Sequence, residues 1–253
     1  MFGKRLRREL LLYLKKLWPF IITVEVMFGL ALLFVFLDRN PEEATGSMAA
    51  LGLFVMVAIG YVILIFLHAY SAIDRVLWTE KQGSPRDTMV LLVVQLVAFL
   101  IVLAASGLMF LADFTAIMWN AVGDLFASFG ENWYYFLDFV FYFVVVASTV
   151  FTVTATWVAQ ARLDKQNKKA RLRAKILGAI TLLFCLGSIV PETLLLVHDT
   201  STDMPGVWAF TITALAMFVL VDIYMYIVTR RTVNAAFSKP TEEKDSIDES
   251  KND

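Results

Sequence analysis

Six long apolar runs dominate this sequence, and their length constrains the fold more than any other feature. An α-helix rises about 1.5 Å per residue, so about 20 apolar residues cross the hydrocarbon core of a bilayer. We therefore predict an all-α polytopic membrane protein, with a single transmembrane domain over residues 1–237. Its six transmembrane helices lie at about 19–37, 48–70, 89–112, 134–159, 175–197 and 207–229.

The composition supports a membrane protein. With 59% hydrophobic and only 18% charged residues, the chain lies outside the usual range of soluble globular proteins. The single cysteine, Cys185, lies in an apolar run, which excludes an intrachain disulfide and a cysteine-based metal cluster. Residues 238–253 are polar, mixed in charge and free of aromatic residues, so we predict a disordered tail there.

Lysine and arginine are segregated among the loops. Of the 22 cations, all but Arg39 lie before the first run, in residues 71–88, in residues 160–175 or after residue 229. Loops rich in lysine and arginine stay on the cytoplasmic side of a membrane. We therefore expect both termini and these two loops to be cytoplasmic, in a multi-pass protein of the plasma membrane.

The first segment, residues 3–17, has leucines at helical spacing on one face and cations on the rest. A basic amphipathic helix of this kind lies in the membrane interface, against anionic headgroups. A signal peptide is the alternative interpretation. The apolar run that follows is long for a signal peptide, however, and no convincing cleavage site comes after it. We predict an interfacial elbow helix followed by an uncleaved first span.

A second amphipathic pattern covers residues 114–129, where apolar residues recur at spacings of three, four, seven and eight. It predicts an outer helix between spans three and four that lies on the outer leaflet or dips into it. In the fifth run, Pro191 removes a backbone hydrogen-bond donor, so we expect the helix to bend or end at that residue.

Ionisable residues inside the apolar runs are conspicuous, because a charge at bilayer depth costs a few kcal/mol unless it is paired, hydrated or neutralised. Glu25 and Asp222 each lie roughly 10 to 12 Å inside the cytoplasmic face, at about 1.5 Å per residue. The functional interpretation is that both line one cavity of a transport pathway, together with Gln95. The alternative is that each bonds to a neighbouring helix or is reached by water near the interface.

Enzyme motifs are missing from the sequence. It has no GxSxG, no HExxH, no glycine-rich loop ending in GK[ST] and no cysteine or histidine pair at metal-ligand spacing. His68 and His198 lie near opposite membrane faces, and we expect each to be solvated. The basic run at 160–175 is explained by membrane orientation, so no nucleic-acid partner is expected. We predict no catalytic residue and no metal site.

Three stretches carry a family resemblance. They are the opening MFGKRLRRELLLYLKKLWPF, the charged island SAIDRVLWTEKQGSPRDT at 71–88, and ARLDKQNKKARLRAKILGAI at 161–180. Together they resemble the permease subunits of type 2 ABC exporters, in particular the small six-span proteins of Gram-positive bacteria. In that family these places hold the elbow helix, the first intracellular loop with its coupling helix, and the basic loop before span five. The chain lacks the family's Glu-x-Gly-Thr and Leu-Pro pattern in the first intracellular loop.

The resemblance implies a subunit that binds no cofactor directly and takes energy from ATP through two copies of a separate ABC ATPase subunit. A second copy of the permease, or a related permease, would complete the pathway within the membrane lipid. The implied cargo is an amphipathic peptide, an antibiotic or a lipid-like molecule moving out of the cell. The implied contact with the ATPase falls on Asp74, Arg75, Trp78, Glu80 and Lys81.

Two other classes of function stay open from the sequence. One is a non-transporting membrane scaffold or an immunity protein that sequesters a toxin. The other is an intramembrane enzyme that uses Glu25, Asp222 or Glu192. A gene for an ATPase beside the gene for this chain would favour the transporter. Loss of product formation in Glu25→Gln, with assembly intact, would favour the enzyme.

Overall fold

The computed structural model describes residues 2–37, 45–78, 84–118, 133–163, 167–197 and 205–238. These residues form helices without any strand, which confirms the predicted all-α class. The helices are α1 (Phe2–Leu37), α2 (Thr45–Trp78), α3 (Pro85–Met118), α5 (Trp133–Arg162), α6 (Lys168–Val197) and α7 (Pro205–Phe237).

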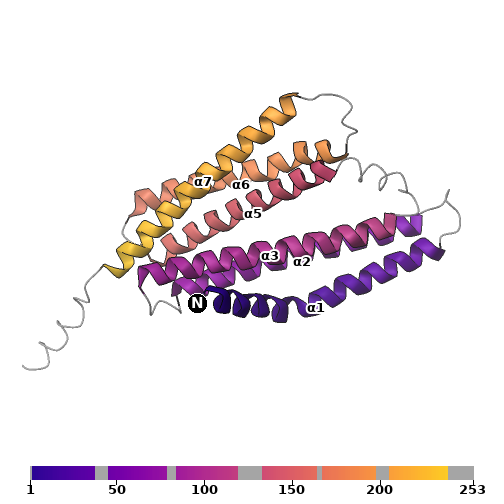
Figure 1. Cartoon of the computed structure of the whole chain (residues 1–253), viewed down its shortest axis with the longest axis horizontal. Helices are drawn as coiled ribbons and strands as arrows, with labels where there is room; N and C mark the ends of the chain where they lie inside the picture. The colour runs from indigo at the N-terminus through magenta and orange to yellow at the C-terminus, as the bar shows by residue number, and fades with distance from the viewer. Residues whose placement is uncertain are drawn as a thin grey trace, which may run out of the picture.

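The helices form two groups of three that lie side by side (Figure 1). Helices α1, α2 and α3 pack on one another, and so do α5, α6 and α7. Contacts of α5 with α2 and α3, and of α7 with α3, join the two groups. As a result α1 and α7 lie on opposite sides of the molecule in Figure 1, with α3 and α5 between them.

Four helical segments among the described residues are long and apolar enough to cross a membrane. They are Gly52–Trp78, Pro85–Met109, Phe141–Arg162 and Ala209–Phe237. Many large apolar side chains on these helices point outward, among them Met56, Ile63, Leu108 and Leu220. An outward apolar surface is what lipid requires of a helix bundle. The remaining helices, α1 and α6, each begin with a basic segment.

The predicted elbow helix is not a separate element. Helix α1 runs without a break through 36 residues, with Pro19 inside it. Proline has no N–H, so the helix loses one hydrogen bond at that turn and bends rather than ends. Figure 1 shows this bend in α1. The hydroxyl of Thr23 donates to the Pro19 carbonyl oxygen at 2.9 Å, in the same turn. The basic segment is therefore connected to the first apolar run by a continuous backbone helix.

Other boundaries also differ from the sequence expectations. Helix α2 continues through Trp78, so residues 71–78 of the charged island are helical rather than loop. Helix α6 continues past Pro191 to Val197, so it does not end at the proline. Of the predicted outer helix at 114–129, the first five residues extend α3 to Met118, and the rest lies outside the described residues. The predicted tail lies outside them from residue 239 onward.

Two apolar clusters hold the described helices together. The larger one joins α1, α2, α3, α5 and the end of α7, with Tyr13, Ile65, Phe99 and Phe151 among its buried members. The aromatic ring of Phe99 lies 5.1 Å from that of Phe66 and 5.5 Å from that of Phe151, centroid to centroid. The smaller cluster joins α5, α6 and α7. The larger cluster thus extends across both groups of helices, and α5 and α7 contribute to both clusters.

Candidate functional site

The end of α2 carries polar contacts to two other helices. Its last two turns contain Asp74, Arg75 and Trp78, three of the residues to which the family resemblance assigns the ATPase contact. Glu80 and Lys81 lie outside the described residues, and their role stays a prediction. The next described residue, Ser84, starts α3 with a reciprocal cap. Its hydroxyl accepts from the Asp87 N–H at 3.2 Å, and the Asp87 carboxylate accepts from the Ser84 N–H at 3.4 Å.

Arg75 points into the protein, where it meets a buried carboxylate on α1. Its Nη2 donates to Oε2 of Glu9 at 2.6 Å. The second oxygen, Oε1, accepts from Nη2 and Nε of Arg8 at 2.9 and 3.1 Å. The Glu9 side chain is only 1% exposed, whereas that of Arg75 is 34% exposed. The two helices are therefore joined by a buried carboxylate held between two guanidinium groups.

Gln95 on α3 lies beside this cluster, where its side chain favours the ionised form of Glu9. Burial raises the pKa of the Glu9 carboxyl. The side chains of Gln95 and Arg8 and the charges of Arg75 and Arg8 outweigh burial and hold that pKa below its usual value. Gln95 is fully buried and its Oε1 has no hydrogen-bond partner. The structure thus places this predicted pathway residue beside the ion pair of α1 with α2.

An aromatic pair lies one turn further along α1. The ring of Tyr13 packs edge-on against His68 of α2, with 4.3 Å between the ring centroids. Tyr13 is completely buried and its hydroxyl has no hydrogen-bond partner. Burial, and then the neighbouring charge of Glu9, raise the pKa of Tyr13, so it stays neutral at physiological pH. His68 is also buried, so the expectation that it is solvated is wrong. His198 lies outside the described residues.

Asp74 joins α2 to α5 on the more exposed side of the same helix end. Nε and Nη2 of Arg162 donate to Oδ1 and Oδ2 of Asp74 at 3.0 and 3.4 Å. The same guanidinium lies 5.2 Å from the centre of the Trp78 ring, in cation–π geometry. Trp78 is 59% exposed. The end of α2 is therefore connected by side chains to α1 and α5, while its terminal tryptophan faces outward.

Glu9 was missed in the sequence because it lies within a run of cations. Its local context is that of a surface helix, and only its burial against α2 and α3 makes it a central residue. A signal was nevertheless present, since it is the only acid in the amphipathic segment 3–17. An isolated acid among many cations is a candidate for ion pairing, although the sequence does not say with which of them.

The two intramembrane acids do not meet in this chain. Glu25 lies on an exposed face of α1, and Asp222 lies on α7, across the molecule in Figure 1. Oδ1 of Asp222 accepts from the hydroxyl of Thr152 on α5 at 2.7 Å. One turn further along the same interface, the hydroxyls of Thr156 and Thr229 lie 2.9 Å apart. Hydroxyl groups thus lie beside the acid and one turn further along the contact between α5 and α7.

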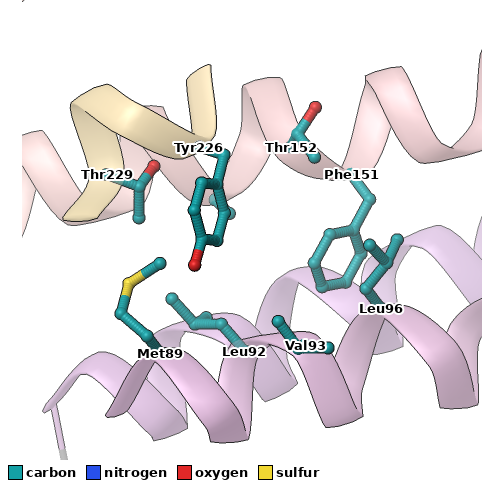
Figure 2. Close-up of a pocket in the computed structure, with 9 residues that line it drawn as sticks. Met89, Leu92, Val93, Leu96, Phe151, Thr152, Tyr226 and Thr229 are labelled. Carbon is teal, nitrogen blue, oxygen red and sulfur yellow. The ribbon is translucent and has the colours of Figure 1, made fainter. Parts of the chain in front are cut away.

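A small cavity of about 50 Å³ lies between α3, α5 and α7 (Figure 2). In Figure 2 the hydroxyl of Tyr226 points toward the α3 residues, while the hydroxyl of Thr152 is turned away from the cavity. The surface of the cavity is therefore mostly apolar, although polar residues contribute to it. Its lining consists of Met89, Leu92, Val93, Leu96, Phe151, Thr152, Ala155, Tyr226 and Thr229.

This cavity is too small for the cargo that the family resemblance implies, because sites for drug-sized molecules measure about 300 to 1,000 Å³. Among the described residues, no group of three or more His, Cys, Asp and Glu side chains is arranged to hold a metal ion. No family model, curated protein or solved structure matches this chain with significant similarity. The function of the helix ends and of the α5–α7 contact therefore has to be inferred from the chain's own residues.

Proposed function

We propose that this chain is the membrane-spanning permease subunit of an ATP-driven ABC exporter, with six spans and both termini in the cytoplasm. The observation that carries the proposal is the end of α2. There Arg75 bonds to Glu9 of α1, Asp74 bonds to Arg162 of α5, and Trp78 is left exposed. A partner that pushes on Trp78 would move α2 together with the helices tied to it.

A conformational switch needs a partner whose contacts differ between the two states. An ATPase pair that closes on ATP and opens after hydrolysis supplies that difference, and the exposed Trp78 supplies an aromatic anchor of the kind found at protein interfaces. In this proposal Asp74 and Arg75 transmit the movement within the chain. Trp78, with Glu80 and Lys81 beyond it, makes the contact with the ATPase.

The ends of the helices support the proposed orientation. The start of α1, the start of α3, the start of α6 and the end of α7 lie at the same end of the bundle in Figure 1. Three of these places carry basic clusters in the sequence, at residues 4–8, 168–175 and 230–231. Clustered cations of this kind are expected on the cytoplasmic side. The end of α2, which leads into α3, would then face the cytoplasm and the ATPase.

The proposed cargo is an amphipathic peptide, an antibiotic or a lipid-like molecule, and its path runs between two permease chains. The exposed carboxylate of Glu25 supports a path along the outer surface of the bundle, because a charge on the apolar part of α1 needs a partner or water at that surface. A second copy of this chain, or a related permease, would supply the opposite wall.

Exchange of Trp78 for alanine, in the permease co-expressed with its ATPase, tests the proposal. Aromatic anchors at interfaces contribute about 2 kcal/mol or more, so we expect roughly 30-fold weaker assembly and a matching loss of stimulated ATP hydrolysis. Trp18→Ala is the matched control, because Trp18 on α1 is similarly exposed, at 56%. Unchanged assembly and unchanged stimulation in Trp78→Ala, with a normal elution profile, would contradict the proposed function.

A further inference from the structure

Another cavity, of about 290 Å³, lies between α1 and α3. Its volume is close to that of the smallest sites that hold drug-sized molecules. Helix α1 lines it with Leu10, Leu14, Leu17 and Ile21. These four residues share one face of the helix and extend over about 16 Å of its axis. The α1–α3 cavity is therefore elongated, and the proposed function gives it no role.

The cavity lies beside the bend of α1. Pro19 stands between Leu17 and Ile21, two of the lining residues, and Figure 1 shows α1 bending over this stretch. A bend carries part of a helix away from its neighbours. The walls of an apolar gap lose the dispersion contacts that packed side chains make. A hydrocarbon chain that enters the gap restores those contacts.

Two hydroxyl groups belong to the lining, and both have partners within the protein. The Ser106 hydroxyl donates to the Val102 carbonyl oxygen at 2.8 Å and lies 3.4 Å from the Tyr61 hydroxyl. The remaining lining side chains are hydrocarbon, apart from the thioether of Met109. The walls of the cavity therefore suit an apolar chain and offer no charged group to a ligand.

The face of α1 that lines the cavity carries a charge beyond each end. Residues three or four apart lie on the same face of a helix. Arg7 precedes Leu10 by three positions, and Glu25 follows Ile21 by four. Both charged residues are exposed, and Arg7 has no ion-pair partner among the described residues. An anionic group is therefore attracted to the Arg7 end of the cavity and repelled from the Glu25 end.

We propose that the α1–α3 cavity binds one acyl chain of an anionic phospholipid, whose phosphate lies at Arg7. The lipid comes from the leaflet that faces the start of α1. Its chain fills the space beside the bend, and its headgroup stays at the membrane surface. The apolar walls select hydrocarbon, and the unpaired guanidinium selects an anionic headgroup over a zwitterionic one. The bound chain then joins α1 to α3 across the gap.

Photo-crosslinking of the full chain in vesicles tests where the lipid binds. The vesicles are phosphatidylcholine with a small fraction of phosphatidylglycerol that carries a diazirine in its acyl chain. We expect adducts on Leu14 and Ile101, and their loss in Ala105→Phe, because the new ring occupies the cavity. Leu220→Phe is the matched control, at an outward position of α7 that is 66% exposed. Adducts that persist in Ala105→Phe with a normal elution profile, or that are absent from the cavity, would overturn the proposal.

Native mass spectrometry of the full chain in micelles tests the choice of headgroup. We expect phosphatidylglycerol to bind more tightly than phosphatidylcholine. Arg7→Gln should weaken the binding of phosphatidylglycerol about fivefold and leave phosphatidylcholine unchanged, because one surface cation is lost. Lys16→Gln is the control, since Lys16 is also exposed but its charge acts on His68 of α2.

Equal binding of the two lipids, or equal effects of Arg7→Gln and Lys16→Gln, would contradict the proposed site. A dimer that forms in place of lipid binding would show instead that a second copy of the chain covers the cavity, and would also overturn the proposal. Neither measurement needs an ATPase, so their outcome is independent of the proposed function.

Discussion

Glu9 accepts more hydrogen bonds from guanidinium groups than Glu25, Asp74 or Asp222, the described acids that stand out in the sequence. Its burial at 1% exposure would be costly for an unpaired charge, and both of its oxygens are bonded to guanidinium groups. The ion pair between Asp74 and Arg162 has the same chemistry but is more exposed, with side chains 29% and 47% exposed. Exposed pairs contribute about 0 to 1 kcal/mol. Burial, rather than charge, therefore distinguishes the two contacts of α2.

The effects of neutralising Glu9 and Arg75 on stability should not be additive. We expect Glu9→Gln to lower the free energy of unfolding by about 1 to 3 kcal/mol, because Arg75 is left near buried surface without its anion. Glu9→Gln combined with Arg75→Gln should cost less than the sum of the single changes. Unfolding of the purified chain in micelles measures all three. Strict additivity would show that the pair is not coupled.

Lowering the pH should remove the stabilisation that the ionised Glu9 carboxylate provides. The pKa of Glu9 is held below its usual value of 4.5, so its stabilising effect is present above that value and is lost as the pH falls through the lower, folded value. Glu9→Gln should therefore flatten the acid limb of the stability curve. Asp74→Asn serves as the control for general acid sensitivity, and an equal flattening in both variants would argue against a special role for Glu9.

The contact of α5 with α6 shows how closely two of these helices approach. Nε1 of Trp157 donates to the Ala174 carbonyl oxygen at 3.2 Å. A methyl group added at Gly178 would lie 2.7 Å from that same Nε1 and 2.8 Å from Cγ1 of Val153. Small residues permit such close packing between membrane helices. The glycine is therefore required at this position by space, not by backbone conformation.

Gly178→Ala should separate α5 from α6, at a cost of about 1 to 3 kcal/mol in unfolding free energy, because a methyl group is forced into a packed contact. Gly187→Ala is the matched control on the same helix, since nothing lies within 4 Å of a methyl group there. Helix propensity by itself favours alanine at both positions. A stabilised Gly178→Ala variant would contradict the close approach of α5 and α6.

The described helices form two three-helix groups joined through α2, α3, α5 and α7, and the polar contacts of Glu9 and of Asp222 lie in different groups. The Glu9–Arg75 pair belongs to the group of α1, α2 and α3. The bond between Thr152 and Asp222 belongs to the contact of α5 with α7. A force applied at the end of α2 would reach α5 through the pair between Asp74 and Arg162. The two sets of contacts can therefore be altered separately.

The proposed six-span arrangement predicts which positions a membrane-impermeant maleimide can reach. In a Cys185→Ala background, cysteines at Ser84, Asn167 and Ser238 should be labelled from the cytoplasmic side only. Cysteines at Asn40 and Ser201 should be labelled only from outside. Cys185 itself is buried and should stay unlabelled in the wild-type chain. Labelling of Ser84→Cys from outside intact cells would contradict the proposed topology.

The sequence by itself determined the helical class, because runs of apolar residues that long can satisfy their backbone groups in lipid only as helices. It also identified Asp222 as an exception, since a charge within an apolar run is visible without any structure. The ends of the helices were harder to predict from the sequence. Arg75 and Trp78 looked like loop residues because they are polar or interfacial, yet α2 continues through them and packs on its neighbours.

Only the tertiary structure decided which of these residues meet. Glu9 and Arg75 are 66 positions apart, and Thr152 and Asp222 are 70 apart. Whether two such side chains touch depends on the rotation and depth of each helix, which packing against other helices sets. For the same reason Glu25 and Asp222, at similar predicted depth, lie on helices at opposite sides of the bundle. A sequence fixes the position of a residue along its own helix, whereas the neighbours it faces depend on the other helices.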